Sequence, residues 1–287
     1  MVLPAAAVSD LACRRDPSGR LEVLGPDGTP VASLGTNDWE TRFFGRPLGG
    51  LTIAAGTAAA LGLAAWREAI RLLTREAGSY DLVQVHLDAQ DHQLAPALEE
   101  AGFRLADTRI TFVTHVGRDH SIRHEPRAGA VRLARETDLA ALGDLARQGL
   151  TNNPAFHSRY KDPAYFTPEE GDRWFMAWVK NDLADPASLV AVWEVDGRPV
   201  GFFGYARRGE RKGWPYYRGT LLAIEPAWQG KRGQLAMDAY LYGQMPSPEF
   251  WVENVTQLTN IPTFRNYLAS GKRLDRIELT FFRPRPA

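Results

Sequence analysis

Two segments of the chain, residues 82–112 and 251–281, follow the same pattern at one constant offset. Each segment reads as an apolar strand, a polar residue, an amphipathic helix, a glycine and a second apolar strand. Strands that alternate with helices are typical of α/β proteins. The pattern predicts an α/β (α+β) fold with a mixed sheet, in which both halves end in the same strand–helix–strand unit. The matched pairs are Asp91 with Asn260, Gly102 with Gly271, and Phe112 with Phe281.

The two segments differ at one position that matters for chemistry. Leu98 in the first segment lies where the second has Tyr267. Leucine has no proton to give, whereas a phenol can act as a general acid. If one segment is catalytic, it is therefore the second.

The rest of the chain alternates in the same way. A polar stretch at 117–129 breaks the periodicity and is typical of a linker. We expect a first domain over 1–118, a linker over 119–129 and a second domain over 130–287. Other expected elements are a hairpin (21–34), a strand and helix (131–150), a helical region (about 153–183), two strands joined by an Asp-Gly turn (189–208), and a further strand (216–226).

Composition narrows the choice of partner. Lys plus Arg and Asp plus Glu both number 34, so the formal net charge is zero and no overall field attracts nucleic acid. The single cysteine, Cys13, excludes a disulfide framework within the chain, and six scattered histidines show no metal-ligand spacing. We expect no nucleic-acid partner and no metal.

One uncharged stretch, between Arg46 and Arg67, is nearly long enough to span a bilayer. It consists mostly of Ala, Gly and Thr, so we expect a strand near 48–53 and then a buried helix instead. The first ten residues lack the features of a secretory signal. These features predict a cytoplasmic protein without a membrane segment.

The segment 221–241 contains a candidate anion site. An apolar strand stops at Pro226, a glycine-containing turn follows over 228–234, and a helix begins there. Free N–H groups at a helix N-terminus bind anions such as a pyrophosphate, and Lys231 and Arg232 would add charge. An ordinary strand-to-helix connection has the same pattern, so both interpretations stay open.

The segment 259–271 contains a candidate acid. Asn260 follows a strand, Tyr267 lies two helical turns later, and Gly271 ends the helix. The reference pKa values of a phenol and a thiol, about 10 and 8.5, are close enough for proton transfer between them. The alternative is a half-buried core tyrosine.

Asn260, Tyr267 and Gly271 stand in the N-x6-Y-x3-G pattern of the GNAT acetyltransferase superfamily, which the second half resembles over about 130–285. The resemblance implies a GNAT fold that takes acetyl-CoA as co-substrate, with Tyr267 as general acid to the departing thiolate. It further implies cofactor contacts from Asn260, from the strand residues Leu222 and Ile224, and from the turn residues Gln229, Gly230, Lys231, Arg232, Gly233 and Gln234.

The whole chain also resembles the dTDP-fucosamine acetyltransferase family. That family carries a truncated GNAT-like N-terminal domain with a W-x3-FFG signature, matched here by Trp39, Phe43, Phe44 and Gly45. The resemblance implies an N-acetyltransferase that acts on a dTDP-linked amino sugar. Further matches are F-x-SR-[YF] (Phe156, Ser158, Arg159, Tyr160) and W-x2-N (Trp178, Asn181).

The turn departs from the usual Q/R-x-x-G-x-G/A pattern. Counting from Gln229 puts Arg232 and Gln234 at the two glycine positions. Counting from Gly230 recovers Gly233 and loses the glutamine. Side chains at these positions would obstruct a close approach of the backbone to a phosphate.

The acceptor and its base are less constrained. Glu225 on the strand before Pro226 is one candidate base, and His157 is another because its reference pKa is near 6.5. Aromatic faces beside an arginine suit a nucleotide sugar, although the same residues could simply pack the domain. The predicted acceptor-binding residues are Phe156, His157, Arg159, Tyr160, Tyr216 and Tyr217.

The favoured function is therefore transfer of acetyl from acetyl-CoA to the amine of a small polar acceptor. Alternatives are acetylation of another amine (amino acid, polyamine, aminoglycoside or protein terminus) and a non-catalytic acyl-CoA-binding module, which the irregular turn suggests. A homodimer is possible.

Overall fold

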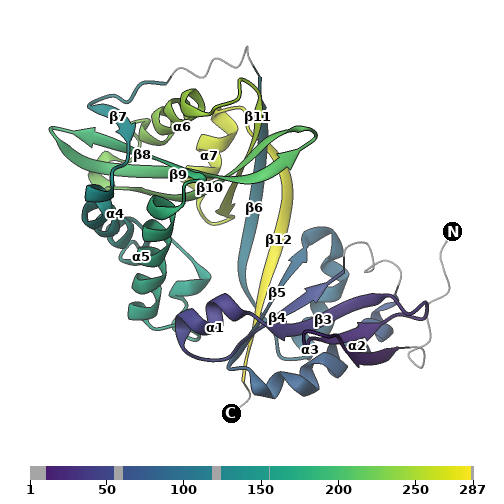
Figure 1. The fold of residues 1–287 in the computed structure, drawn as a ribbon. Coiled ribbons are helices and arrows are strands. Elements are labelled where there is room, and N and C mark those ends of the chain that lie inside the picture. Colours follow the sequence, from purple (N-terminus) through teal and green to yellow (C-terminus); the bar gives the residue numbers. More distant parts are fainter. Residues whose placement is uncertain (1–10, 55–60, 118–123, 155, 286–287) are drawn as a thin grey trace. The chain divides into compact units, whose positions relative to one another are not determined.

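The computed structural model describes residues 11–54, 61–117, 124–154 and 156–285 (Figure 1). The chain divides into two compact units, and each combines strands with helices. The first unit comprises residues 1–109 and 277–287, and the second comprises 110–276. The two units are defined by contacts between residues, whereas the predicted domains 1–118 and 130–287 are continuous stretches of the sequence. The predicted domain boundaries therefore stay a prediction.

The first unit holds a sheet in the order β1-β2-β3-β4-β5-β12. Its strands pair antiparallel, except that β4 and β5 are parallel. Its elements are β1 (Ala12–Arg15), β2 (Leu21–Leu24), β3 (Pro30–Thr36), α1 (Asp38–Phe44), β4 (Leu48–Ile53), α2 (Leu63–Arg75), β5 (Leu82–Asp88), α3 (Ala95–Glu100), the start of β6 (Arg104–Val116) and the end of β12 (Arg273–Pro284).

The core of the first unit is apolar. Trp66, Ile70 and Leu73 of α2 and Leu98 of α3 are fully buried in it. The predicted hairpin is confirmed as β2 and β3, and the uncharged stretch contains β4 and the start of α2. Residues 55–60 of that stretch lie outside the described part. Within the described residues, no helix has the length and apolar character needed to cross a membrane.

The second unit holds strands in the order β6-β11-β10-β9-β8-β7. Figure 1 shows α4 and α5 on one side of β8, β9 and β10, and α6 and α7 on the other. Its further elements are β7 (Ala130–Leu133), α4 (Leu139–Ala146), α5 (Pro168–Ala184), β8 (Ser188–Val195), β9 (Arg198–Arg211), β10 (Trp214–Ile224), α6 (Gly233–Gln244), β11 (Phe250–Gln257) and α7 (Ile261–Ala269).

The predicted helical region over 153–183 is wrong in its first half. Its regular structure begins with a 3₁₀ turn, Arg159–Lys161, and α5 starts only at Pro168. Thr167 caps α5 in a capping box with Glu170, and proline at the first helical position suits the start of a helix. The aromatic residues before Thr167 therefore lie in a loop.

The two repeated segments form the predicted strand–helix–strand units, β5–α3–β6 and β11–α7–β12. Their last strands, however, each begin in one unit and end in the other. Residues 278–284 of β12 pair with β5 in the first unit, and Phe281 lies in the apolar core there. Its counterpart Phe112 of β6 packs in the second unit against Tyr267. The two halves have exchanged their final strands.

Candidate functional site

The site is built around a split between β10 and β11. These parallel strands are in register from Tyr216–Trp251 to Arg218–Glu253, and the described residues show no further pair beyond that point. The next residue of β10 is Gly219, where a Cβ would lie 2.5 Å from the Asn254 amide nitrogen. Between Gly219 and Leu222 the pairing of β10 with β9 also shifts, which is a β-bulge. Bulges redirect side chains and backbone locally.

Beyond the bulge, every second residue of β10 points its backbone N–H and C=O groups toward the split between β10 and β11. Glu225 donates its N–H to Val200 on β9, so the backbone groups of Ile224 point the other way. The Ile224 carbonyl accepts a hydrogen bond from Gln229 Nε2 at 3.3 Å. By the two-residue period, Leu222 shares this direction. Both predicted strand residues thus present their backbone to the split.

The turn before α6 has two left-handed residues, Gly230 with φ of 74° and the N-cap Arg232 with φ of 64°. A non-glycine residue in this region costs about 1–2 kcal/mol. Gly233 begins the helix, and a Cβ there would lie 2.2 Å from the Trp193 ring. Packing against Trp193 therefore fixes the glycine at Gly233. The Arg232 side chain does not cap α6, so its first N–H groups can face an anion.

The remaining turn residues give a cationic edge. The Lys231 ammonium lies 4.1 Å from the centre of the Trp228 ring, and Arg232 is exposed. Gln234, the second helical residue, is instead buried. Its Oε1 accepts a hydrogen bond from Asn266 of α7 at 2.8 Å, which joins the two helices.

Tyr267 projects from α7 into the second unit and is 3% exposed. Its ring packs on Phe112, with ring centres 5.4 Å apart. Burial, and then the charge of Asp238, raise the pKa of Tyr267 far above its usual value, whereas the side-chain amides of Asn254 and Gln234 act to lower it. The reference pKa values of a free phenol and a free thiol are close, but the pKa of Tyr267 in this environment is not the reference value. The comparison of reference values therefore does not apply to Tyr267.

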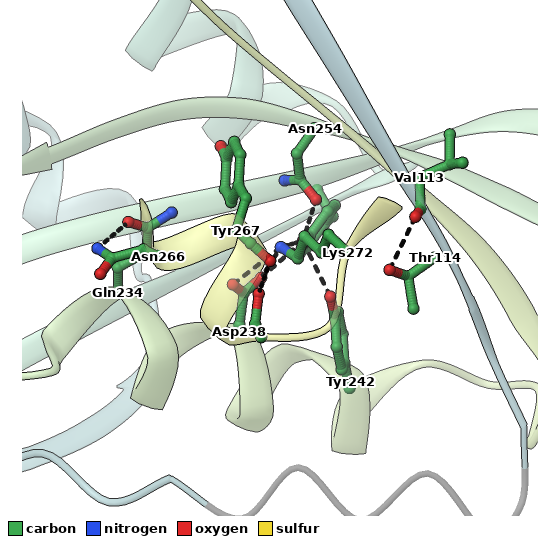
Figure 2. Close-up of polar contacts among 11 residues, drawn as sticks. Val113, Thr114, Gln234, Asp238, Tyr242, Asn254, Asn266, Tyr267 and Lys272 are labelled. Carbon is green, nitrogen blue, oxygen red and sulfur yellow. Dashed lines mark hydrogen bonds and ion pairs between the residues drawn. The ribbon is translucent and has the colours of Figure 1, made fainter. Parts of the chain in front are cut away.

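A buried polar cluster lies directly beside Tyr267 (Figure 2). Lys272 is 0% and Asp238 1% exposed, and their ion pair measures 3.0 Å from Nζ to Oδ2. The Tyr205 hydroxyl donates to Asp238 Oδ1 at 2.6 Å, and it lies 3.0 Å from Asn254 Oδ1. Lys272 Nζ is also 4.6 Å from the centre of the Tyr267 ring. Sequence reasoning missed this cluster.

The end of α7 places Lys272 there. Gly271 has φ of 74°, and Lys272 donates its N–H to the Tyr267 carbonyl while Gly271 donates to Leu268. These two bonds form a Schellman motif, which reverses the chain at a helix end. The motif folds Lys272 back beneath the tyrosine. At the other end of α7, Asn260 is the N-cap, and its side chain accepts from Thr263.

Asp182 is a second group that sequence reasoning missed. It lies on α5, is 9% exposed and faces the bulge residues Thr220 and Leu221 from the side opposite α6. Burial raises the pKa of Asp182 to about 6, although Thr220, Arg208 and the Leu221 amide act to lower it. A carboxyl group that titrates near neutral pH suits general acid–base chemistry.

The predicted base Glu225 lies at the outer end of β10. Its carboxylate pairs with Arg198 at 2.7 Å. Glu225 is four positions from Leu221 of the bulge, which corresponds to about 13 Å along a strand. Glu225 is therefore nearer to the turn before α6 than to the start of the split.

Tyr216 and Tyr217 have different surroundings. The Tyr216 hydroxyl donates to the buried Glu253, and burial together with this carboxylate raises the pKa of Tyr216 to about 12. Arg218 and Arg276 also pair with Glu253, at 2.8 and 3.3 Å. Tyr217 points to the opposite face and is buried in the apolar core.

The loop that was predicted to bind the acceptor is stabilised by contacts of its own side chains with the second unit. Tyr160 is buried and its ring stacks on that of Trp174, with ring centres 4.0 Å apart. The Arg159 guanidinium carbon lies over the Tyr160 ring, 4.6 Å from its centre. Phe156 is half-buried and His157 is exposed.

Lys161 is the centre of this loop. Its ammonium donates to the carbonyls of Leu150, Asn153 and Phe156 at 2.9, 2.7 and 2.7 Å. A lysine in a polar loop gives no sequence signal for such a role. In the described part of the chain, no group of three His, Cys, Asp or Glu side chains could hold a metal ion.

No protein-family model matches the sequence, and no curated protein sequence matches it. The structure is similar to the GCN5-related N-acetyltransferase from Sphaerobacter thermophilus, with a TM-score of 0.59 and 16% identity over 93% of this chain and 81% of that one.

Two further solved structures are similar. The GCN5-related N-acetyltransferase from Kribbella flavida has a TM-score of 0.54 and 13% identity over 97% of this chain and 91% of that one. A tandem GNAT protein from the clavulanic acid biosynthesis pathway has a TM-score of 0.51 and 11% identity, over 97% and 84%. The chain therefore has the GNAT fold, and the predicted fold class is confirmed.

Proposed function

We propose that this protein is an acetyl-CoA-dependent N-acetyltransferase whose active site lies in the second unit. The observation that carries the proposal is the position of Tyr267 within a GNAT fold. Tyr267 is buried on α7, the side-chain amides of Asn254 and Gln234 act to lower its pKa, and Asn254 lies beside Gly219, where the pairing of β10 with β11 ends. The GCN5-related neighbours support the same reaction class.

The residues present fit acetyl-CoA as a co-substrate. The side-chain nitrogens Asn254 Nδ2 and Gln234 Nε2 are buried and make no hydrogen bond of good geometry among the described residues, although both lie near enough to the Tyr267 hydroxyl to lower its pKa. Buried polar groups normally have partners, so a polar ligand suits this place. The backbone of Leu222 and Ile224 would hold the pantetheine arm, and the α6 N-terminus with Lys231 and Arg232 the pyrophosphate.

Acetyl-CoA supplies an activated acetyl group as a thioester. Tyr267 would protonate the departing sulfur. Burial disfavours the thiolate as it disfavours the phenolate, because both are anions removed from water. The proton affinities of the two groups therefore rise together, which keeps transfer from Tyr267 feasible.

We assign the general base to Asp182, with Glu225 as the alternative. Asp182 belongs to α5 and acts together with Thr220 and Leu221 of the bulge, whereas Tyr267 belongs to α7, which lies on the other side of β10 (Figure 1). An amine arriving on the α5 side could lose its proton to Asp182 while Tyr267 acts on the other side. Glu225 lies farther along β10 and is already paired with Arg198.

We expect the turnover number of the wild type to rise with pH through about 6, because Asp182 accepts a proton only as a carboxylate. Asp182→Asn should lower turnover about a hundredfold and remove this rise. The measurement is the release of CoA thiol between pH 5 and 8 with the fastest acceptor of an amine panel. If Glu225→Gln removes the rise and Asp182→Asn keeps it, Glu225 is the base.

Stability gives an independent check on Asp182. Its folded pKa, about 6, exceeds the reference value of 3.8, so ionisation at pH 7 costs the fold about 3 kcal/mol. This cost is absent below about pH 4 and complete above about pH 6. Asp182→Asn should therefore be more stable than the wild type at pH 7 but not at pH 4.

For the acceptor, we propose a small amine, and more specifically a dTDP-linked amino sugar. Support comes from Arg218, which pairs with Glu253 beside the split while its side chain is 40% exposed, and could meet a diphosphate. Other amines and a non-catalytic acyl-CoA-binding module remain the alternatives. The cytoplasmic location and a homodimer stay predictions from the sequence.

Ligand-dependent melting separates these possibilities. We expect CoA and acetyl-CoA each to raise the melting temperature, because a ligand that binds only the folded state stabilises it. A further rise with dTDP but not with UDP would support a dTDP-linked acceptor. A protein whose melting is unchanged by both CoA compounds would contradict the enzyme and the acyl-CoA-binding proposals together.

A further inference from the structure

The two halves of the chain provide an internal comparison for the residues around Tyr267. The constant offset that matches Leu98 with Tyr267 also places α2 on α6 and β5 on β11. Five positions of the polar surroundings then fall on five apolar residues that are all buried in the first unit, at 1% exposure or less. The pairs are Gln234 with Ala65, Asp238 with Ala69, Asn254 with Val85, Tyr267 with Leu98, and Lys272 with Phe103.

The backbone around Phe103 and Lys272 is alike in the two halves. Phe103 donates its N–H to the Leu98 carbonyl at 3.0 Å, as Lys272 does to Tyr267 at 3.0 Å. Gly102 has a positive φ, as Gly271 does. The comparison is therefore between equivalent places at the end of equivalent helices.

The fold itself does not need the polar residues. The first unit packs the same helices and strands around alanine, valine, leucine and phenylalanine. A buried ion pair costs desolvation, and apolar residues of suitable size often stabilise a protein as well or better. The second unit nevertheless keeps Asp238 and Lys272 fully buried, which points to a task other than folding.

We propose that the Asp238–Lys272 pair is a positioning device that holds Tyr267 and its amide partners for proton transfer. This inference rests on the proposed acetyltransferase function. Asp238 fixes Lys272 through both carboxylate oxygens, at 3.1 and 3.0 Å. Lys272 in turn lies against the face of the Tyr267 ring, where a cation is attracted.

The same pair orients Asn254. Tyr205 donates to Asp238, accepts from Lys272 at 3.2 Å and lies 3.0 Å from Asn254 Oδ1. The Tyr205 hydroxyl fixes the orientation of the Asn254 amide, which acts to lower the pKa of Tyr267. An amide donor and a nearby ammonium both stabilise a phenolate.

The proton balance is closed. The thioester C–S bond of acetyl-CoA breaks, and the O–H bond of Tyr267 breaks as an S–H bond forms on the leaving CoA sulfur. The amine loses one proton to the base as its new C–N bond forms. The base releases that proton to solvent, and Tyr267 regains one from solvent. Lys272 and Asp238 exchange no proton in this scheme.

The test copies the core of the first unit into the second. Asp238→Ala with Lys272→Phe reproduces Ala69 and Phe103. We expect this double variant to fold and to keep the melting shift with CoA, while its turnover falls about tenfold to a hundredfold. Full turnover in the folded double variant would overturn the inference.

A second comparison tests whether the pair acts through Tyr267. In a Tyr267→Phe background the same double substitution should lower turnover by less than about threefold, because residues that act as a unit are not additive. An undiminished loss in that background would mean that the pair acts elsewhere, which also overturns the inference.

Lys272→Arg keeps the charge and covers the case in which the double variant does not fold. It should retain more turnover than Lys272→Met at equal CoA binding. Equal turnover of these two folded variants would overturn the inference. If the wild-type protein acetylates none of the tested amines (nucleotide-linked amino sugars, amino acids, polyamines and aminoglycosides), the proposed function itself is contradicted, and the inference with it.

Discussion

Tyr267→Phe is expected to lower turnover about a hundredfold or more and to leave the melting shift with CoA unchanged. General acids typically contribute factors of about 10²–10⁴. Phenylalanine keeps the ring that packs on Phe112 and lies over Lys272, so only the hydroxyl is removed. Release of CoA thiol with the fastest acceptor measures the first quantity, and thermal melting with CoA measures the second.

Tyr242→Phe is the matched control. Tyr242 is another tyrosine beside Lys272, whose Nζ lies 6.0 Å from its ring centre. Its hydroxyl contacts that of Tyr205 at 3.4 Å, whereas the amides of Asn254 and Gln234 act on Tyr267. This variant should keep turnover within about threefold. If Tyr267→Phe also stays within threefold of the wild type, Tyr267 is a core tyrosine and not the acid.

The second large effect concerns stability. We expect Lys272→Met to lower the free energy of unfolding by about 3–5 kcal/mol, because it leaves the buried Asp238 carboxylate without its ion-pair partner. Chemical denaturation at pH 7 measures this loss. Asp238→Ala in the same chain should restore much of it, since the charge that was left unpaired is then gone.

Arg198→Ala is the control for this prediction. Arg198 also pairs with a carboxylate, Glu225, but its side chain is 58% exposed. Such pairs contribute about 1 kcal/mol or less. A loss for Lys272→Met as small as that for Arg198→Ala would contradict the account of a buried, coupled pair. A loss that Asp238→Ala does not reduce would contradict it as well.

Much of the local structure was predictable because it depends on nearby residues. The segment from Asn260 to Gly271 carries its own start and stop signals, and α7 forms there with Asn260 as N-cap. The strand, the turn and the helix around Gly233 were predictable for the same reason. The loop before α5 was not, because its aromatic residues are typical of a packed helix while its course depends on Lys161 and three carbonyls.

The buried polar groups were missed because they meet only in three dimensions. Asp238, Lys272 and Tyr205 come from a helix, a helix end and a strand that are far apart in sequence. Asp182 in α5 looks like any polar residue of an amphipathic helix. One signal was present: Asp238 interrupts the otherwise apolar run 235–241. Such a run is typical of a helix that is buried on several sides, so a charge within it needs a buried partner.

The exchange of final strands makes the two halves of the chain depend on each other for folding. A fragment that ends before residue 277 would lose the strand that pairs with β5. A fragment that begins after the linker would lose Phe112, the ring on which Tyr267 packs. Each half thus completes the other, and neither can be deleted without opening a sheet. The first unit is therefore needed to complete the fold of the second, even though its own interior is apolar.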